Sequence, residues 1–151
     1  TMASSAHIIA ITDGQGQILE PLWLERAAAV HRQLRPMLPE AYAEKMQRVF
    51  AGGARMVVAV QDEVVVGLAL YRLYENTYEN LRLYVDDLVT DEAARSQGIG
   101  SLLLNWCETH AKAQGAEWSV LDSGTWRTDA HRLYFRHGFV ISSFHFTRKL
   151  S

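Results

Sequence analysis

The six residues Arg95-Ser96-Gln97-Gly98-Ile99-Gly100 decide how this sequence is expected to fold. They join a strand-like stretch, residues 81–90, to a strongly amphipathic helix that begins at Ile99. Glycines at the start of a helix let backbone N–H groups approach an anion, and the helix dipole then favours a phosphate. The loop lacks both the third glycine of the dinucleotide fingerprint and the Gly-Lys-Ser/Thr of a P-loop. Taken alone, it indicates either a phosphate cradle or a glycine turn that only connects the two elements.

Strand and helix patterns alternate on both sides of this loop. We expect strands over residues 7–12, 55–61, 64–74, 81–90 and 117–122, helices over 19–34, 40–51, 99–114 and 128–137, and one or two last strands over 139–150. No linker, internal repeat or low-complexity segment interrupts this order. The sequence therefore predicts one α/β domain.

The strand over residues 81–90 contains a change of phase. Leu81, Leu83 and Val85 keep one apolar alternation, and Asp86 and Asp87 then interrupt it before apolar residues resume. A phase slip inside a strand predicts a β-bulge, and bulges often lie beside active sites. The alternative is that the strand ends before the two aspartates.

The composition narrows the class of protein. With 151 residues, 48% of them hydrophobic and 21% charged, the chain can bury a core as one globular domain. Its net charge of −2 provides no basic excess for binding nucleic acid. No apolar run can span a bilayer, and no signal-peptide pattern is visible, so we expect no membrane partner. Because Thr1 precedes Met2, we expect the natural chain to begin at Met2 and the domain to cover residues 2–151.

Cysteine and histidine usage bears on location and on metals. The single cysteine, Cys107, excludes an intramolecular disulfide and favours a reducing compartment, so we expect a cytoplasmic location. The six histidines are scattered and form no zinc-like cluster, so we expect structural or surface roles for them and no metal.

The loop resembles the R/Q-x-x-G-x-G/A signature of the GCN5-related N-acetyltransferase (GNAT) superfamily. A second stretch, Leu-Tyr-Phe-Arg-His-Gly-Phe at residues 133–139, is similar to the family's L-Y-x-x-x-G-F and lies at a family-like separation. The resemblance covers nearly the whole chain. It implies the GNAT acyl-CoA N-acyltransferase fold, with a mixed central sheet of about six to seven strands and about four helices.

The resemblance also implies acetyl-CoA as co-substrate and indicates its binding residues. The loop and first helical turn would cradle the pyrophosphate through Arg95, Ser96, Gln97, Gly98, Ile99, Gly100 and Ser101. Leu88, Val89 and Thr90, just after the bulge, would pair their backbone with the pantetheine arm, which the family places between two splayed parallel strands. A backbone N–H near Leu88 or Val89 would polarise the thioester carbonyl.

Two residues are the implied catalytic pair. Tyr134 lies where the family usually has a tyrosine that protonates the departing CoA thiolate, although its place on an apolar helix face also suits a core residue. Asp86 falls where polyamine acetyltransferases of the superfamily carry a glutamate, and a carboxylate there suits proton removal through a water. Because other members use no dedicated base, Asp86 is a candidate base, a cation-binding residue or a solvated strand residue.

Further residues are expected near the substrates. Arg127 stands where the family often has asparagine, and it either reaches a cofactor phosphate or is a solvated charge. Trp126 beside it covers the pantetheine, lines the acceptor pocket or only packs. Asp87 and Tyr84 are expected to bind the acceptor. They belong to a set of acidic and aromatic residues that also contains Tyr71, Tyr74, Glu75, Tyr78, Glu79, Asp86, Asp91 and Glu92.

An acidic, aromatic groove favours a cationic amine through charge and cation–π attraction. We therefore expect an N-acetyltransferase that acetylates a primary amine of a small, cationic acceptor by direct attack in a ternary complex. The alternatives are a protein lysine or N-terminal acetyltransferase, a non-catalytic acyl-CoA-binding sensor, and another nucleotide-binding α/β protein. The resemblance also suggests a homodimer paired through C-terminal strands, with Phe144, Phe146 and Leu150 as an apolar stripe; the alternative is a stripe packed inward.

Overall fold

The structure is a computed structural model that describes residues 5–151. The chain divides into two compact units between Val120 and Leu121. The first unit carries most of a β-sheet and three α-helices, and the second carries one α-helix and the C-terminal segment. The expected chain start at Met2 lies outside the described residues.

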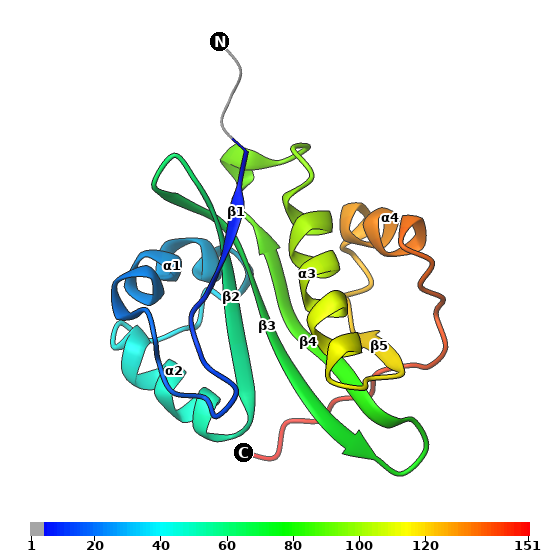
Figure 1. Cartoon of the computed structure of the whole chain (residues 1–151). Helices are drawn as coiled ribbons and strands as arrows, with labels where there is room; N and C mark the ends of the chain where they lie inside the picture. Colours follow the sequence, from blue (N-terminus) through cyan, green and yellow to red (C-terminus); the bar gives the residue numbers. More distant parts are fainter. Residues whose placement is uncertain (1–4) are drawn as a thin grey trace. The chain divides into compact units, whose positions relative to one another are not determined.

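A five-stranded sheet organises the first unit, with its strands in the order β1-β2-β3-β4-β5 (Figure 1). The strands are β1 (His7–Ala10), β2 (Ala54–Gln61), β3 (Val64–Asn76), β4 (Asn80–Thr90) and β5 (Trp118–Leu121). The neighbours from β1 to β4 pair antiparallel. The chain reaches β5 through helix α3 (Ile99–Ala113), the kind of long crossover that parallel neighbours require.

Helices cover both faces of this sheet. The helices α1 (Pro21–Leu34) and α2 (Tyr42–Ala51) lie on one face, and α3 lies on the other (Figure 1). A short 3-10 turn, Glu92–Ala94, precedes the loop to α3. Buried apolar side chains of α1, α2 and β2–β4 form the core on the first face, among them Leu24, Met46, Phe50, Met56 and Leu68.

Gly67 on β3 lets α3 approach the sheet closely. A Cβ added at this position would lie 2.7 Å from Cγ2 of Ile99 and 2.9 Å from the backbone oxygen of Val89. Both contacts are shorter than real Cβ contacts, so a side chain would push the first turn of α3 away from the strands. The glycine therefore fixes where the loop of residues 95–100 begins its helix, next to the end of β4.

The bulge predicted in β4 is confirmed. In the register of β3 and β4, Leu70 faces Asp87 and Tyr71 faces Val85, so Asp86 is the extra residue. A bulge leaves one residue outside the regular ladder and bends the strand. Strand β4 nevertheless continues to Thr90, which excludes the alternative of a strand that ends before the aspartates.

The second unit contains α4 (Thr128–Arg136), close to the predicted short helix, and a C-terminal segment without regular structure. The expected last strands over residues 139–150 are wrong. Phe144, Phe146 and Leu150 are 83%, 90% and 85% exposed. Alternation of apolar residues stabilises a strand only where a neighbouring strand and a buried face receive it, and within residues 5–151 this segment has neither. The sheet therefore has five strands instead of six to seven.

Candidate active site

The bulge of β4 is held by a buried polar network on the α1 side of the sheet. Asp87 is only 8% exposed, and its Oδ2 lies 2.7 Å from Nε2 of His31. Its Oδ1 accepts from Nε and Nη2 of Arg35 at 2.9 and 2.7 Å. His31 lies in the last turn of α1 and Arg35 is its C-cap residue, so the C-terminal end of the helix presents both side chains to the same carboxylate.

Tyr42 of α2 completes this network. Its hydroxyl lies 2.8 Å from Nδ1 of His31. If Nε2 of His31 donates to Asp87, Nδ1 accepts from the Tyr42 hydroxyl, and a neutral imidazole satisfies both contacts. Burial alone would raise the pKa of Asp87, but the hydrogen bonds from His31 and Arg35 and the charge of Arg35 hold it below its ordinary value. The network therefore keeps Asp87 as a carboxylate and uses both of its oxygens.

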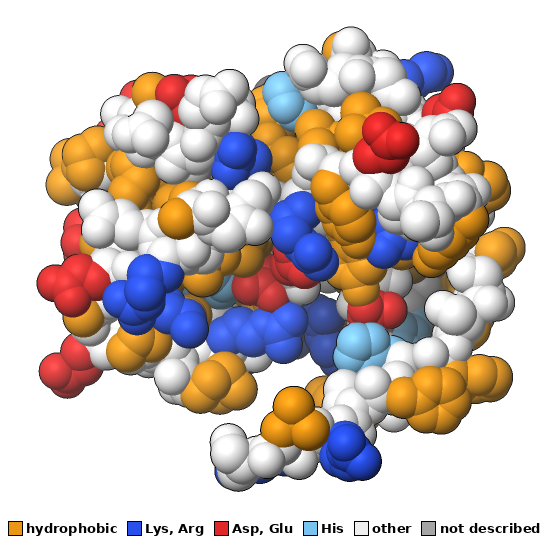
Figure 2. All heavy atoms as spheres, turned by 90° about the horizontal axis from the view of Figure 1, so that it is seen from below, with side chains coloured by type: hydrophobic (Ala, Val, Ile, Leu, Met, Phe, Trp, Pro, Cys, Tyr) orange, Lys and Arg blue, Asp and Glu red, His pale blue; other side chains and the backbone are white. Residues whose placement is uncertain are grey.

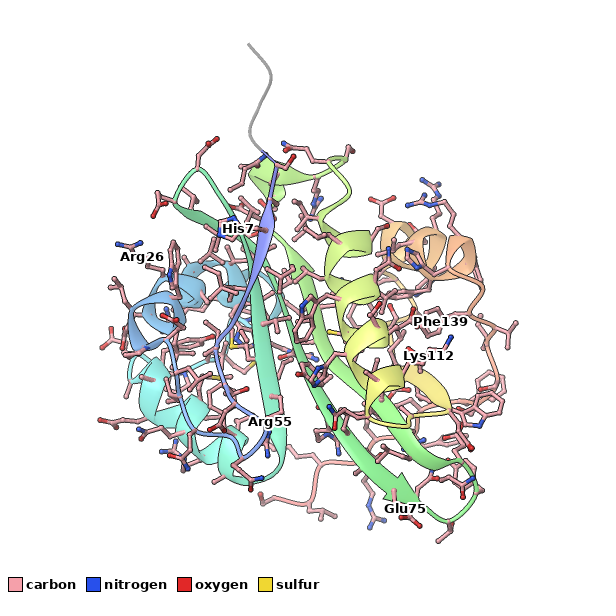
Figure 3. The ribbon with its side chains drawn as sticks, in the orientation of Figure 1. His7, Arg26, Arg55, Glu75, Lys112 and Phe139 are labelled. Carbon is pink, nitrogen blue, oxygen red and sulfur yellow. The ribbon has the colours of Figure 1, made fainter. Side chains whose placement is uncertain are left out.

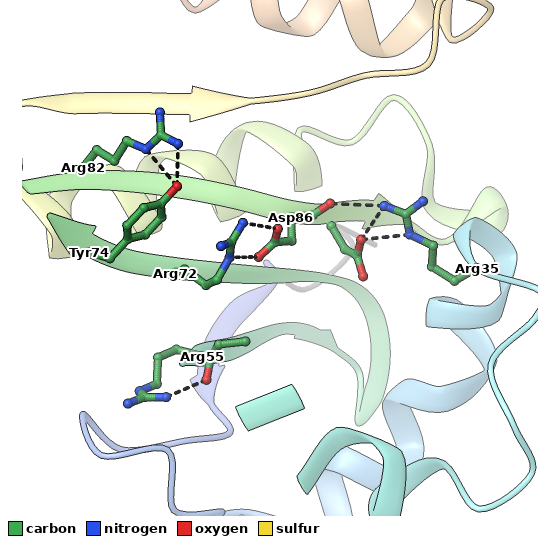
Figure 4. A network of polar contacts seen from close by, with 8 residues as sticks. Arg35, Arg55, Arg72, Tyr74, Arg82 and Asp86 are labelled. Atoms are coloured by element: carbon green, nitrogen blue, oxygen red, sulfur yellow. Dashed lines mark hydrogen bonds and ion pairs between the residues drawn. The ribbon is translucent and has the colours of Figure 1, made fainter. Parts of the chain in front are cut away.

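Asp86, the extra residue of the bulge, is held from the neighbouring strand. Nε and Nη2 of Arg72 donate to its two carboxylate oxygens at 2.8 and 2.9 Å, a bidentate pair (Figure 4). The backbone oxygen of Asp86 accepts from Nη2 of Arg35 at 3.3 Å. This contact gives a hydrogen-bond partner to a carbonyl at the irregularity of the ladder. The bulge is therefore fixed both by β3 and by α1.

Arginines and tyrosines alternate along the same face of β3 and β4. The register places Arg72 opposite Tyr84 and Tyr74 opposite Arg82. The Arg72 guanidinium lies 4.9 Å from the Tyr84 ring and 5.2 Å from the Tyr74 ring. Arg82 donates to the hydroxyl of Tyr74 and, at 2.8 Å, to Glu79. Tyr84, predicted to bind the acceptor, thus stacks against two guanidiniums.

Three carboxylates of the groove expected to be acidic are neutralised by arginines. Asp86, Asp87 and Glu79 each pair with an arginine. Glu75, which points the other way by strand alternation, lies near the end of the β3–β4 hairpin (Figure 3). In Figure 2, basic side chains lie directly beside acidic ones near the middle of the face shown. The sequence revealed the carboxylates and missed the arginines that neutralise them.

The predicted phosphate loop opens α3. Gly98 is the residue before the helix, with a left-handed φ of 77°, and no side chain caps the first turn. An added Cβ at Gly98 would meet no atom within 4 Å, so the glycine is required by its backbone angle. Residues 95–98 are exposed, and Ile99, Gly100 and Ser101 form the first helical turn. A helix start without a side-chain cap suits a bound phosphate.

The residues predicted to contact the pantetheine arm follow the bulge directly. Leu88, Val89 and Thr90 face Ala69, Leu68 and Gly67 of β3 in an antiparallel register. Leu88 and Val89 are each 7% exposed. Any displacement of the bulge would move these backbone groups, because they are the next residues of the same strand.

The second unit carries the remaining predicted residues. Tyr134 is buried on α4, and its ring meets Phe139 edge to face with centroids 6.0 Å apart. Burial raises the pKa of Tyr134 above its ordinary value, while the charge of Arg127 and a hydrogen bond with Arg127 act in the opposite direction. The hydroxyl is therefore protonated at neutral pH and can donate. Trp126 is 80% exposed.

Two further properties of the described residues bear on function. No helix within residues 5–151 has the length and hydropathy to cross a membrane. The same residues contain no group of three or more His, Cys, Asp or Glu side chains that could hold a metal ion.

Comparison with known proteins gives the family. The sequence profile of the Acetyltransferase (GNAT) family matches residues 23–139. The chain belongs to the GNAT acetyltransferase family. The matched stretch contains both the glycine loop that opens α3 and the motif around Tyr134, so it covers the two sequence signatures that suggested the resemblance.

Individual GNAT relatives support the fold and the reaction class. The chain is 39% identical over 88 residues to an aminoalkylphosphonate N-acetyltransferase of Salmonella typhimurium, a match to 58% of this chain and 57% of that protein. It is 34% identical over 109 residues to the uncharacterised N-acetyltransferase YhdJ of Bacillus subtilis, covering 62% and 75% of the two chains. The solved structure of the aminoglycoside N-acetyltransferase AAC(6')-Iy with CoA covers 100% of both chains with a TM-score of 0.78 at 16% identity, which confirms the GNAT α/β fold.

Sequence reasoning missed His31 and the three arginines that pair with the carboxylates of the GNAT site. His31 was expected in a structural or surface role, and Arg35, Arg72 and Arg82 were not singled out. A signal for two of them was present: Arg72-x-Tyr74 and Arg82-x-Tyr84 flank one predicted turn, so alternation places all four on one face of the hairpin. Nothing local predicts that α1 delivers His31 and Arg35 to the same place.

Proposed function

We propose that this GNAT chain is an acetyl-CoA-dependent N-acetyltransferase that acetylates a primary amine of a small acceptor by direct attack in a ternary complex. The observation that carries the proposal is the rigidly held bulge of β4, which is followed at once by Leu88 and Val89 and lies in the same unit as the uncapped start of α3. The family and its named N-acetyltransferase relatives support the reaction class.

The glycine loop fits the co-substrate. The left-handed Gly98, the open space at its Cβ position and the uncapped first turn of α3 leave backbone N–H groups for a pyrophosphate. Arg95 and Ser101 flank these groups on the loop and the helix. Acetyl-CoA supplies the activated acetyl group as a thioester. Leu88 or Val89 would donate a backbone N–H to the thioester oxygen and stabilise the negative charge that develops there.

Tyr134 is the proposed proton donor to the leaving thiolate. Its hydroxyl is held protonated by burial, and the positive charge of Arg127 acts on that hydroxyl. Arg127 is thus proposed to act on the tyrosine. Trp126, largely exposed, remains a proposed contact for substrate.

Asp86 is proposed to hold the acceptor's ammonium group. Arg72 already donates to both of its oxygens, so a proton would have to be accepted in competition with a guanidinium. Each carboxylate oxygen still has a second lone pair for an N–H of the amine. The amine then loses its proton to water before attack, because an alkylammonium with a pKa of about 10 is not nucleophilic.

A covalent route through cysteine is disfavoured. Cys107 is the single cysteine of the chain, and it is fully buried. Burial raises the pKa of its thiol to about 12. Since the thiolate is the nucleophilic form, Cys107 is a poor acetyl carrier, and direct transfer to the amine is the simpler path.

The proposal is tested by following release of free CoA with a panel of primary amines. If the chain is an N-acetyltransferase, we expect CoA release with at least one small amine. We also expect acetyl-CoA to raise the melting temperature, with about 2.7 kcal/mol of stabilisation at a hundredfold excess over Kd. The variant Gly98→Val should lose the acetyl-CoA shift, because the side chain intrudes on the phosphate path. Acetyl-CoA binding without CoA release would identify a sensor module. CoA release only with lysine peptides would identify a protein acetyltransferase.

We also propose a homodimer that covers the exposed Phe144, Phe146 and Leu150. Three large apolar side chains in one exposed segment favour burial against a second copy. Light scattering should give twice the chain mass of 17.0 kDa, and a single-chain mass at micromolar concentration would contradict the dimer.

A further inference from the structure

Two guanidiniums beside the bulge keep one edge free. Nε and Nη2 of Arg72 donate to Asp86, and those of Arg35 donate to Asp87, while neither Nη1 has a hydrogen-bond partner among the described residues. The side chains of Arg72 and Arg35 are 37% and 46% exposed. Each arginine therefore combines a fixed inner edge with N–H donors on Nη1 that have no partner within residues 5–151, on a side chain that is partly exposed.

The two guanidiniums lie near one point of the structure. Arg72 contacts the Asp86 carboxylate at 2.8 Å, and Arg35 contacts the Asp86 backbone oxygen at 3.3 Å. Both guanidiniums thus border the same residue, and Figure 4 shows them on either side of it. Two guanidiniums that contact one residue offer N–H donors to an anion from both sides of that residue, and carboxylates and phosphonates match the planar fork of arginine.

The inner contacts hold the Arg72 guanidinium in place before a ligand arrives. Its ion pair with Asp86 and its stacking on Tyr84 and Tyr74 fix the side chain from three directions. Ordering a free arginine on binding consumes part of the interaction energy, so a guanidinium that is already ordered binds an anion more tightly. A purely structural ion pair needs no such exposed edge.

We propose that Arg35 and Arg72 bind an acid group on the acceptor, so that the acceptors of this enzyme are small amines that also carry a phosphonate, carboxylate or sulfonate. This inference rests on the proposed function, because it concerns the acceptor side of the same site. The ammonium end lies at Asp86 and the acid end at the free edges of the two arginines. A zwitterion complements a face on which each of these guanidiniums is paired with a carboxylate, whereas a polycation would place a second positive charge beside the guanidiniums.

The substrate test uses four amines of matched length and one longer polyamine. Aminoethylphosphonate, β-alanine and taurine carry an acid group, ethanolamine carries a neutral hydroxyl, and spermidine is a polycation. We expect kcat/KM for at least one acid-bearing amine to exceed that for ethanolamine by about 10- to 150-fold, the factor of one charge-assisted hydrogen bond. Equal or better use of ethanolamine or spermidine would overturn the inference. The three acids separate phosphonate, carboxylate and sulfonate preference.

The variant test compares a selectivity ratio, so it tolerates a general loss of activity. Arg72→Gln should bring the ratio of kcat/KM for the acid-bearing amine over ethanolamine close to one. Arg26→Gln is the matched control, since Arg26 lies exposed on α1 with its guanidinium over Trp23 and points away from the sheet (Figure 3). An unchanged ratio in Arg72→Gln, with a folded protein by circular dichroism, would overturn the inference. Arg35→Gln provides the second variant if Arg72→Gln fails to fold.

A binding measurement separates this inference from the transferase itself. At constant ionic strength, methylphosphonate should raise the melting temperature of the wild type and not that of Arg72→Gln. A methylphosphonate shift of this kind, without CoA release in the presence of any amine, would support the anion site and overturn the proposed transferase. CoA release with no acid preference and no methylphosphonate shift would retain the transferase and overturn the anion site.

Discussion

Replacing Asp87 by asparagine tests the buried network behind the bulge. The carboxylate accepts three hydrogen bonds, one from His31 and two from Arg35, at 2.7 to 2.9 Å. Asparagine has nearly the same size, but it carries no charge and has only one acceptor oxygen. The oxygen can still face Arg35, and His31 can adopt its other tautomer toward the amide and Tyr42. The variant therefore isolates the loss of the buried negative charge from the loss of packing.

The structure sets the expected magnitude. Removing one member of a buried ion pair typically costs about 3–5 kcal/mol. Arg35 is 46% exposed, so water compensates part of its lost partner, and we expect the free energy of unfolding to fall by about 2–3 kcal/mol. For a chain of this size, that corresponds to a decrease in Tm of about 4–12 °C. Urea unfolding followed by circular dichroism at neutral pH measures the difference.

The pH dependence adds an independent check. The pKa of Asp87 lies below its ordinary value of 3.8 in the folded protein, so folding stabilises the ionised form of this side chain. The stabilisation is fully present above that ordinary value and is lost as the pH falls through the folded pKa. The difference between wild type and Asp87→Asn should thus be constant near neutrality and shrink below about pH 4.

Glu25→Gln is the matched control for this experiment. Glu25 lies on the same helix α1, is exposed, and undergoes the same change from carboxylate to amide. We expect its free energy of unfolding to stay within about 0.5 kcal/mol of the wild type. If Asp87→Asn changes stability no more than Glu25→Gln does, or if its effect grows in acid, the argument that His31 and Arg35 stabilise a buried charge is refuted.

Three further changes probe the catalytic residues and the position of α3. Tyr134→Phe should lower kcat by about 10- to 1,000-fold with little change in acetyl-CoA affinity, and activity near wild type would show that Tyr134 is only a core residue. Asp86→Asn should raise KM for the acceptor about tenfold with an unchanged pH profile of kcat, whereas activity that recovers only toward alkaline pH would make Asp86 a general base. Gly67→Ala should destabilise the fold by about 1–3 kcal/mol in urea unfolding, because its Cβ would clash with Ile99 and Val89, and an unchanged midpoint would show that α3 can shift freely.

The bulge and the helix start were predictable from the sequence because both are local signals. The phase slip at Asp86 and Asp87 is a direct consequence of the two-residue period of a strand. The glycine before Ile99 marks a helix start that needs a left-handed backbone angle. In each case the signal and the structure lie within the same few residues, so no knowledge of tertiary contacts is needed.

The partners of the two aspartates depend on contacts that local patterns do not encode. His31 is 56 residues from Asp87 along the chain, and Arg35 is 52 residues away. Their meeting depends on how α1 packs on β3 and β4, which is set by the whole core. The same limit explains the error over residues 139–150, since the alternation of apolar residues there predicts a strand without showing whether a neighbour exists to pair with it.

The arginines affect the bulge network in two ways: they stabilise it, and they leave N–H donors without a partner among the described residues. A bulge interrupts the ladder, and a buried carboxylate beside it would be unstable without a partner. Arg35 stabilises both the interrupted ladder and the buried carboxylate, because it binds the carbonyl of Asp86 and the side chain of Asp87. Guanidinium has five N–H donors, and the bulge uses those of Nε and Nη2 of Arg35, so the donors on Nη1 remain. Lysine at position 35 would satisfy the carboxylate as a point charge and would present no further oriented N–H donors. Arg35→Lys should therefore keep a larger share of the fold's stability than of the enzyme's selectivity for acid-bearing amines.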